Sequence, residues 1–262
     1  MEVRAKKNLG QHFLRDLGVA ARIADTVSPD EVGEKLGALP VMEIGPGMGV
    51  LTKFLVDAGR DVTAVELDSE SVEYLSHDMP SLRVVEGDFL KMDLNEIVEG
   101  EMALIGNYPY NISSQIFFKV LDYKDKIPVV SGMLQKEVAE RICARPGGKV
   151  YGILSVLLQA WYDCKYLFSV PPGVFAPPPK VMSGVLRLTR NSRTDLGVSE
   201  AAFRRVVKTA FGQRRKTLRN SIGSLMGADN PIMQDPIMQQ RPERLGVEDF
   251  IRLAKASLRM EI

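Results

Sequence analysis

Short apolar runs alternate with helical patterns from Pro40 onward, and this alternation constrains the fold more than any other feature. The runs are rich in β-branched residues and apolar on both faces, which indicates buried parallel strands. They are VMEI (41–44), VTAVEL (62–67), LRVVEG (82–87), MALIG (102–106) and VVSGML (129–134). Between them we expect helices over Val50–Ala58, Ser69–Ser76 with a serine N-cap, and Ser113–Leu121. Strands and helices in this order predict an α/β sheet with right-handed crossovers.

A proline cluster, VPPGVFAPPPKV (170–181), joins two further strand-like stretches, CKYLFSV (164–170) and VMSGVLRLT (181–189). A proline-rich connection cannot carry a helix, so we expect these strands to extend the sheet in the antiparallel direction. After Thr189 the chain has a polar linker and then only helical patterns. The sequence therefore predicts an α/β domain over residues 1–194 and a small all-helical domain over residues 195–262.

Composition excludes several classes of protein. Of the 262 residues, 45% are apolar and 26% are charged, so a well-filled core is expected and wholesale disorder is excluded. No apolar run approaches the ~18 residues of a membrane span, and the first residues lack the apolar stretch of a signal peptide. Two cysteines suit a reducing cytoplasm, and with only two histidines we predict no metal site.

The small net charge of +1 hides an uneven distribution. Residues 1–15 hold four basic residues and one acidic residue, residues 16–198 hold 18 and 25, and residues 199–262 hold 12 and seven. Between Glu200 and Asp229 there is no acid, while FRRVVKTAFGQRRKTLR carries seven basic residues. A solvated helix face normally mixes both signs, so clustering of one sign favours a polyanion such as nucleic acid.

Three alternate glycines, Gly45, Gly47 and Gly49, follow the first strand directly. They would let the backbone approach a ligand at a helix N-terminus. A glycine-rich turn alone is weak evidence, because any tight strand-to-helix turn favours glycine.

The ends of the next two strands strengthen the case for a ligand. Glu66 ends the second strand, about 20 residues on, where an acid can accept hydrogen bonds from ribose hydroxyls. Asp88 and Phe89 end the third strand, where an acid and an aromatic ring could bind an adenine. Each acid could instead be a plain solvent-facing residue. Three such features at consecutive strand ends favour a nucleoside cofactor.

The fourth strand ends in Asn107-Tyr108-Pro109-Tyr110, which resembles the signature of S-adenosylmethionine-dependent methyltransferases that act on planar amino nitrogens. A closer resemblance is carried by KKNLGQHFL (6–14), EIGPGMGVLT (43–52), VELD (65–68), EGDFL (86–90), GNYPYNIS (106–113), VFAPPPKV (174–181) and FGQRRKTLRNSI (211–222). With these segments nearly the whole chain is similar to the small-subunit (16S-type) rRNA adenine N6,N6-dimethyltransferase family, the KsgA type. His12 and Tyr108 depart from the commonest family residues, asparagine and leucine.

The resemblance implies a Rossmann-like fold that binds S-adenosyl-L-methionine, with His12 and Leu14 of the N-terminal arm as cofactor contacts. It implies dimethylation of two adjacent adenosines in a loop near the 3′ end of small-subunit rRNA, within an assembling subunit. A large-subunit rRNA methyltransferase of the antibiotic-resistance type and a non-catalytic assembly factor are the alternatives. The protein is expected to be a cytoplasmic monomer.

Adenine N6 is a poor nucleophile because its lone pair is delocalised into the ring. Acceptors on its two N–H groups, the Asn107 side-chain oxygen and the Pro109 carbonyl, would favour a pyramidal nitrogen and stabilise developing positive charge. Tyr110 would stack on the base. Phe175 is the candidate for the opposite face, and the alternative is that it is an ordinary core aromatic. Asn107 is also expected at the cofactor.

The acid-free stretch supplies the candidates for rRNA contact, Arg214, Arg215, Lys216 and Arg219. At 3.6 residues per turn Arg215 and Arg219 are expected on one helix face, where several cations could follow a phosphate backbone. The alternative is that these residues solubilise a helix or pair with acids of the larger domain.

Overall fold

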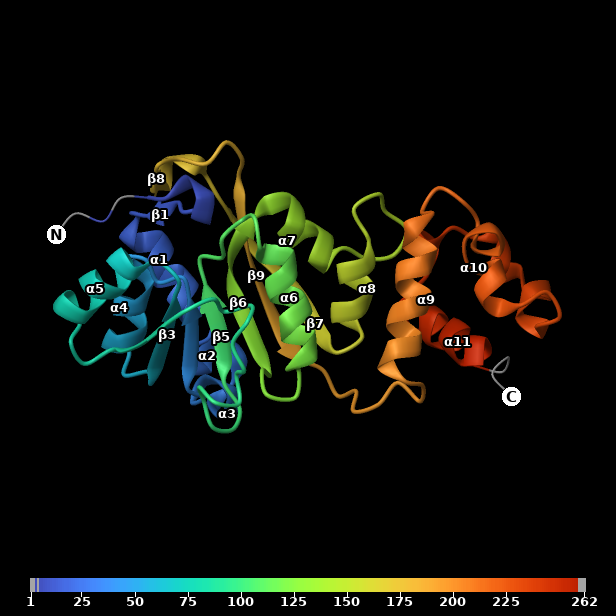
Figure 1. The fold of residues 1–262 in the computed structure, drawn as a ribbon, viewed down its shortest axis with the longest axis horizontal. Coiled ribbons are helices and arrows are strands. Elements are labelled where there is room, and N and C mark those ends of the chain that lie inside the picture. The colour runs from blue at the N-terminus through green and yellow to red at the C-terminus, as the bar shows by residue number, and fades with distance from the viewer. Residues whose placement is uncertain (1–2, 4, 259–262) are drawn as a thin grey trace. The chain divides into compact units, whose positions relative to one another are not determined.

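The computed structural model describes residue 3 and residues 5–258, and they form an α/β unit and a helical unit (Figure 1). The first compact unit comprises the chain up to Glu140 together with Asp163–Arg190, and the second comprises Arg141–Tyr162 with the chain from Asn191 onward. The helical unit thus includes a segment, 141–162, that the sequence placed in the first domain. The predicted end of the helical domain, residues 259–262, lies outside the described residues.

A seven-stranded sheet forms the centre of the first unit, in the order β4-β3-β2-β5-β6-β9-β7. Its strands are β2 (Val41–Ile44), β3 (Val62–Glu66), β4 (Arg83–Glu86), β5 (Ala103–Gly106), β6 (Val129–Gln135), β7 (Tyr162–Val170) and β9 (Ser183–Arg190). The strands β4, β3, β2, β5 and β6 run parallel, as the apolar runs predicted. The Rossmann-like fold is confirmed.

The end of the sheet is antiparallel. β9 pairs with β6 from Ser183 opposite Gln135 to Thr189 opposite Val129, and β7 lies beyond β9 at the edge. A separate pair joins the N-terminal arm to the proline cluster, with β1 (Phe13–Leu14) antiparallel to β8 (Phe175–Ala176). Figure 1 shows β1 and β8 side by side.

Helices and short 3₁₀ turns surround and connect the strands of the first unit. They are α1 (Leu17–Asp25), α2 (Pro29–Val32), α3 (Glu34–Gly37), α4 (Val50–Asp57), α5 (Ser69–Asp78), α6 (Ser113–Asp122), α7 (Lys136–Cys143) and the 3₁₀ turns η1 (Lys7–Leu9) and η2 (Pro172–Val174). The last residues of α7 belong to the second unit. The predicted serine cap of α5 is wrong. Asp68 caps this helix, because its side chain accepts a hydrogen bond from the backbone N–H of Glu70.

One face of the sheet is covered by α1 and α4. Ile23 of α1 and Leu55 of α4 are buried with Val41, Ile105 and Met133 from three neighbouring strands. Near this core, the Arg187 side chain of β9 donates hydrogen bonds to the Thr26 carbonyl and to the Glu31 carboxylate. Packing of this kind holds the parallel strands rigid, so the residues at their carboxyl ends have fixed positions.

The second unit is helical. Its elements are α8 (Ile153–Gln159), α9 (Glu200–Gly212), α10 (Leu218–Met226), α11 (Val247–Ser257) and the 3₁₀ turns η3 (Pro231–Gln234), η4 (Pro236–Gln239) and η5 (Pro242–Arg244). Ser199 caps α9 by accepting from the Ala202 N–H, and Phe203 and Phe250 are fully buried. No helix in the described part of the chain has the length and apolar character needed to cross a membrane.

Candidate active site at the carboxyl ends of the parallel strands

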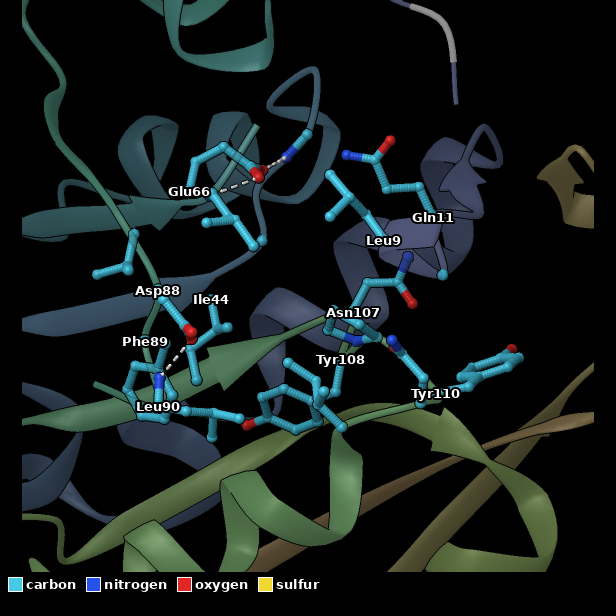
Figure 2. Close-up of a pocket in the computed structure, with 18 of the residues that line it drawn as sticks. Leu9, Gln11, Ile44, Glu66, Asp88, Phe89, Leu90, Asn107, Tyr108 and Tyr110 are labelled. Atoms are coloured by element: carbon cyan, nitrogen blue, oxygen red, sulfur yellow. Dashed lines mark hydrogen bonds between the residues drawn. The ribbon is translucent and has the colours of Figure 1, made fainter. Parts of the chain in front are cut away.

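A pocket of about 290 Å³ opens where the strand order of the sheet reverses. β2 pairs with β3 on one side and with β5 on the other, and the crevice at such a point is where α/β sheets bind ligands. The lining comes from the ends of β2, β3, β4 and β5 and from the N-terminal arm (Figure 2). Among the predicted site residues, the lining includes His12, Gly45, Gly47, Glu66, Asp88, Phe89, Asn107, Pro109 and Tyr110.

The glycine loop after β2 has the backbone conformation that only glycine adopts readily. Gly45, Gly47 and Gly49 have φ values of 64°, 57° and 75°. A Cβ atom on Gly45 would meet nothing within 4 Å, whereas one on Gly47 would lie 2.9 Å from the Phe13 ring. Gly45 therefore leaves room for a ligand at the backbone, and Gly47 allows the arm to pack closely.

Glu66, at the end of β3, faces the pocket and is buried. Its Oε2 accepts from the Gly47 N–H at 3.0 Å, and its Oε1 accepts from the N–H groups of Leu67 and Asp68 at 2.8 and 2.9 Å. Burial raises the pKa of Glu66, while these N–H donors act in the opposite direction. Both lone pairs of Oε1 are thus used, and Oε2 keeps one lone pair that can accept a hydroxyl donor.

Asp88 and Phe89 follow β4 and form another part of the wall. Asp88 Oδ1 accepts from the Leu90 N–H at 3.0 Å, which holds the turn in place. Lys119 of α6 donates to the carbonyls of Leu90 and Met92, and its ammonium lies 5.2 Å from the centre of the Phe89 ring. The polar Asp88 and the apolar Phe89 ring thus occupy fixed positions beside each other.

Asn107, after β5, is tied to the N-terminal arm. Its Nδ2 donates to the His12 carbonyl at 2.9 Å. A carbonyl can only accept, so this bond sets the amide orientation and leaves Oδ1 as the acceptor for another group.

Tyr108 also lines the pocket, but its side chain is almost wholly buried. Its hydroxyl donates to the Ser131 carbonyl at 2.6 Å, and its ring packs edge-on against Phe117. A Cβ on Gly132 would lie 2.8 Å from this ring, so the glycine makes room for the large side chain. The large Tyr108 side chain therefore packs directly against β6 at Gly132.

Pro109 and Tyr110 complete the loop. The Pro109 carbonyl accepts from the Ile112 N–H at 3.2 Å, which uses one of its two lone pairs. Tyr110 extends away from Glu66 and Asp88 in Figure 2, and its hydroxyl lies 2.5 Å from Ser183 Oγ. The His12 ring, held by Nδ1 at 2.7 Å from the Pro177 carbonyl, lies 5.5 Å from the Tyr110 ring. An aromatic wall therefore borders Asn107.

Leu14 and Phe175 are placed differently from the other predicted residues. They pair with each other across β1 and β8, and their side chains are 5% and 4% exposed in the hydrophobic core. Neither residue is among the described residues that line the pocket of about 290 Å³. For Phe175 this favours the core position over a place against the target base.

A buried acid, Glu43 of β2, was missed by the sequence reasoning. Its side chain is 1% exposed, and its Oε2 has no hydrogen-bond partner among the described residues. Burial is the main reason that its pKa rises to about 8, with the Thr52 hydroxyl lowering it and the charge of Glu66 raising it further. It borders a cavity of about 30 Å³ beside Gly45 and Asn107. The signal was present as a charged residue inside the apolar strand VMEI.

The predicted rRNA contacts lie in the helical unit, but the expectation that Arg215 and Arg219 share a helix face is wrong. α9 ends at Gly212 and α10 begins at Leu218, so Arg215 lies in the turn and Arg219 in the next helix. Arg215 and Lys216 are exposed. Arg214 donates to the carbonyls of Gly148 and Lys149, and Arg219 donates to the Met233 carbonyl.

The sequence of the chain matches a known protein family over almost its whole length. The family described as "Ribosomal RNA adenine dimethylase" matches the chain over residues 2–256. The chain belongs to this family.

In the residues that the structure describes, no group of three or more histidine, cysteine, aspartate or glutamate side chains could hold a metal ion.

Individual relatives agree with this assignment. The chain is 61% identical over 257 residues to "Ribosomal RNA small subunit methyltransferase A" of Parabacteroides distasonis, covering 97% of this chain and 94% of the relative. The protein of the same name from Porphyromonas gingivalis is 58% identical over 97% of both chains.

Solved structures agree on the fold. A dimethyladenosine transferase from Plasmodium falciparum has a TM-score of 0.75 at 22% identity, covering 92% of this chain and 96% of the other. The 23S rRNA methyltransferase ErmE has a TM-score of 0.59 at 28% identity, covering 93% and 98%.

Proposed function

We propose that this protein transfers methyl groups from S-adenosyl-L-methionine to N6 of two adjacent adenosines in a loop near the 3′ end of small-subunit rRNA. One observation carries the proposal. A single pocket in a member of the rRNA adenine dimethylase family brings Glu66 at the end of β3 and Asp88 just after β4 together with the Asn107–Tyr110 loop. The relatives at 61% and 58% identity are named for the small subunit, which favours this substrate over large-subunit rRNA.

The cofactor would occupy the part of the pocket between the glycine loop and the ends of β3 and β4. Glu66 is held by three backbone N–H groups, and the remaining lone pair of its Oε2 can accept a ribose hydroxyl, as acids at this position do. Asp88 and the Phe89 ring would receive the adenine edge and face. Gly45 leaves its backbone open to the methionine part. When bound, S-adenosylmethionine supplies a methyl group on a positively charged sulfur.

The target adenine would meet the Asn107–Tyr110 loop. Because Asn107 Nδ2 is engaged by the His12 carbonyl, its Oδ1 can accept one N6–H, and the remaining lone pair of the Pro109 carbonyl can accept the other. These fixed acceptors stabilise the positive charge that develops on N6, and they need no reorganisation during the reaction. Tyr110 would pack on the base, which must leave its stack to enter the pocket.

The helical unit would bind the rRNA through its exposed cations. Arg215 and Lys216 lie in the turn between α9 and α10, and the bonds of Arg214 bring the loop 144–152 beside that turn. This loop adds exposed Arg145 and Lys149. Cations drawn from two segments suit the phosphate backbone of a folded RNA. We also propose that the protein is a cytoplasmic monomer, in keeping with its two cysteines, which suit a reducing compartment, and with a pocket whose described lining lies within the first unit.

The test incubates the purified protein with labelled S-adenosylmethionine in two separate reactions, followed by mass spectrometry of the rRNA. One reaction holds small subunits assembled from unmethylated rRNA, and the other holds unmethylated large-subunit rRNA. We expect two adjacent adenosines, each with two added methyl groups. Label in large-subunit rRNA alone would identify the antibiotic-resistance type of enzyme. Tight rRNA binding with no label transferred would identify a non-catalytic assembly factor, and either result would overturn the proposal.

A further inference from the structure

The N-terminal arm forms one wall of the cofactor pocket. Five consecutive residues, Leu9–Phe13, line it, and Figure 2 shows Leu9 and Gln11 facing Glu66 across the pocket. Gly10 has a φ of 67°, and a Cβ there would lie 2.7 Å from Asn111 Oδ1. The arm therefore packs closely against the loop that carries Asn107, and a cofactor enclosed by these walls is bounded by the arm on one side.

A cluster of polar contacts fastens the start of this arm to the start of α5. Lys6 Nζ lies 2.5 Å from Asp68 Oδ1 and 3.0 Å from Glu70 Oε1. Gln11 Nε2 donates to Asp68 Oδ2 at 3.2 Å, and Gln11 Oε1 accepts from the Lys6 N–H at 2.7 Å. Both ends of the segment from Lys6 to Gln11 are thus bound to the same carboxylate.

Asp68 is built into the structure that positions Glu66. Its side chain is 1% exposed, it caps α5, and it accepts from Ser71 Oγ. Its backbone N–H donates to Glu66 Oε1. Burial raises the pKa of Asp68, but the hydrogen bonds from Lys6, Gln11 and Ser71 outweigh burial and lower it. The buried carboxylate is therefore a charged anchor, and Lys6 is its counter-ion.

We propose that Lys6 and Asp68 are positioning residues, whose ion pair holds the N-terminal arm against the cofactor pocket and sets the residence time of bound S-adenosylmethionine. The inference rests on the proposed function, because it requires that the pocket bind this cofactor. Neither side chain lines the pocket, so neither touches the reacting groups. Loss of the ion pair should leave the wall residues present but let the arm open more often.

The experiment compares two neighbouring lysines. Lys6→Ala removes the counter-ion of Asp68, and Lys7→Ala makes the same change in charge at an exposed residue of the same turn. Dissociation of S-adenosylmethionine is followed by stopped-flow displacement with excess S-adenosylhomocysteine. We expect S-adenosylmethionine to dissociate about three- to tenfold faster from Lys6→Ala, because the variant loses a hydrogen bond between charged groups that is partly exposed to water. We expect Lys7→Ala to release the cofactor at the wild-type rate.

Further variants separate positioning from a general loss of stability. Lys6→Arg keeps the charge and should restore slow dissociation, and Asp68→Asn keeps a helix-capping residue but loses the charge, so it should behave like Lys6→Ala. In Lys6→Ala the KM for the cofactor should rise by a similar factor. The single-turnover rate at saturating cofactor should stay unchanged. Because Lys6→Ala leaves a buried carboxylate without its counter-ion, its thermal midpoint should fall, whereas Asp68→Asn leaves no unpaired buried charge, so fast dissociation in both variants separates positioning from stability.

Two outcomes would overturn the inference in distinguishable ways. Equal dissociation rates for Lys6→Ala, Lys7→Ala and the wild type would show that the ion pair does not hold the arm, with the proposed function intact. A wild-type protein that binds no S-adenosylmethionine would overturn the proposed function and the inference together. Hydrogen exchange of residues 9–11 without cofactor adds a direct check, since the arm should exchange faster in Lys6→Ala and Asp68→Asn than in the wild type and Lys7→Ala.

Discussion

Replacing the buried acid Glu43 by glutamine should stabilise the protein at high pH. The Glu43 side chain is 1% exposed, and one of its oxygens has no hydrogen-bond partner in the described part of the chain. An ionised carboxylate in such a position is strongly unfavourable, so the group stays protonated in the folded protein. Glutamine has nearly the same shape and no charge, and its amide can donate to the buried Thr52 hydroxyl, which lies close enough to lower the pKa of Glu43.

The magnitude follows from the difference between the folded and unfolded pKa values. The pKa of Glu43 is about 8 in the folded protein, against an ordinary value of 4.5. Between these values the folded state binds one proton more than the unfolded state, so the free energy of unfolding falls by about 1.4 kcal/mol per pH unit. This contribution is fully present below pH 4.5 and is lost as the pH rises through 8, which amounts to about 2 kcal/mol between pH 6 and pH 8.

The assay is urea unfolding of the wild type and Glu43→Gln at pH 6 and pH 8, followed by far-ultraviolet circular dichroism. The single tryptophan, Trp161, belongs to the helical unit, so its fluorescence reports separately on the part of the chain without Glu43. The matched control is Glu86→Gln, which makes the same change at an exposed position of β4.

The stability gained from Glu43→Gln should be about 2 kcal/mol larger at pH 8 than at pH 6, and Glu86→Gln should show no such dependence. An equal gain at both pH values would refute the reasoning. It would mean that Glu43 is either ionised or exposed to water in the folded protein.

Three further predictions concern the site and the rRNA surface. Glu66→Ala should weaken S-adenosylmethionine binding by about tenfold or more in calorimetry, because a charged acceptor is lost, and unchanged affinity would exclude its role at the ribose. Asn107→Ala should lower the single-turnover methylation rate by about 10²-fold, with a smaller loss of cofactor affinity; a normal rate at saturation would refute its role at N6. Arg215→Ala with Lys216→Ala should make the dependence of log K on log salt shallower by about one to two units for rRNA, and an unchanged slope would contradict phosphate contact. These two residues are better probes than Arg219, which also donates to the Met233 carbonyl.

Much of the fold, and the part of the pocket that lies at the strand ends, could be predicted from the sequence. The apolar runs of the five parallel strands and the helices between them are local patterns, so each segment carries its own signal. Because parallel strands end at one edge of a sheet, the order of Glu66, Asp88 and Asn107 along the chain was enough to expect them at one site. The glycines of the loop at 45–49 could be predicted for the same reason, since they follow a strand and precede a helix.

Several elements near the ends of the chain could not be predicted in this way. The arm that contains Lys6 and Gln11 has no periodic pattern, and its partner Asp68 is 62 residues from Lys6 in the sequence. The break between α9 and α10 places Arg215 in a turn, although the basic run continues through it without a change in composition.

The sequence by itself determined the strand–helix order, the sheet class and the chemistry at the strand ends, because these depend on neighbouring residues and on a shared edge. Tertiary structure alone decided which side chains are buried and which are paired. Phe175 lies in the core, Glu43 has no partner for one oxygen in the described residues, and Asp68 has Lys6 as its counter-ion. The physical reason is that burial and ion pairing depend on contacts between residues far apart in the chain, and local sequence patterns do not encode those contacts.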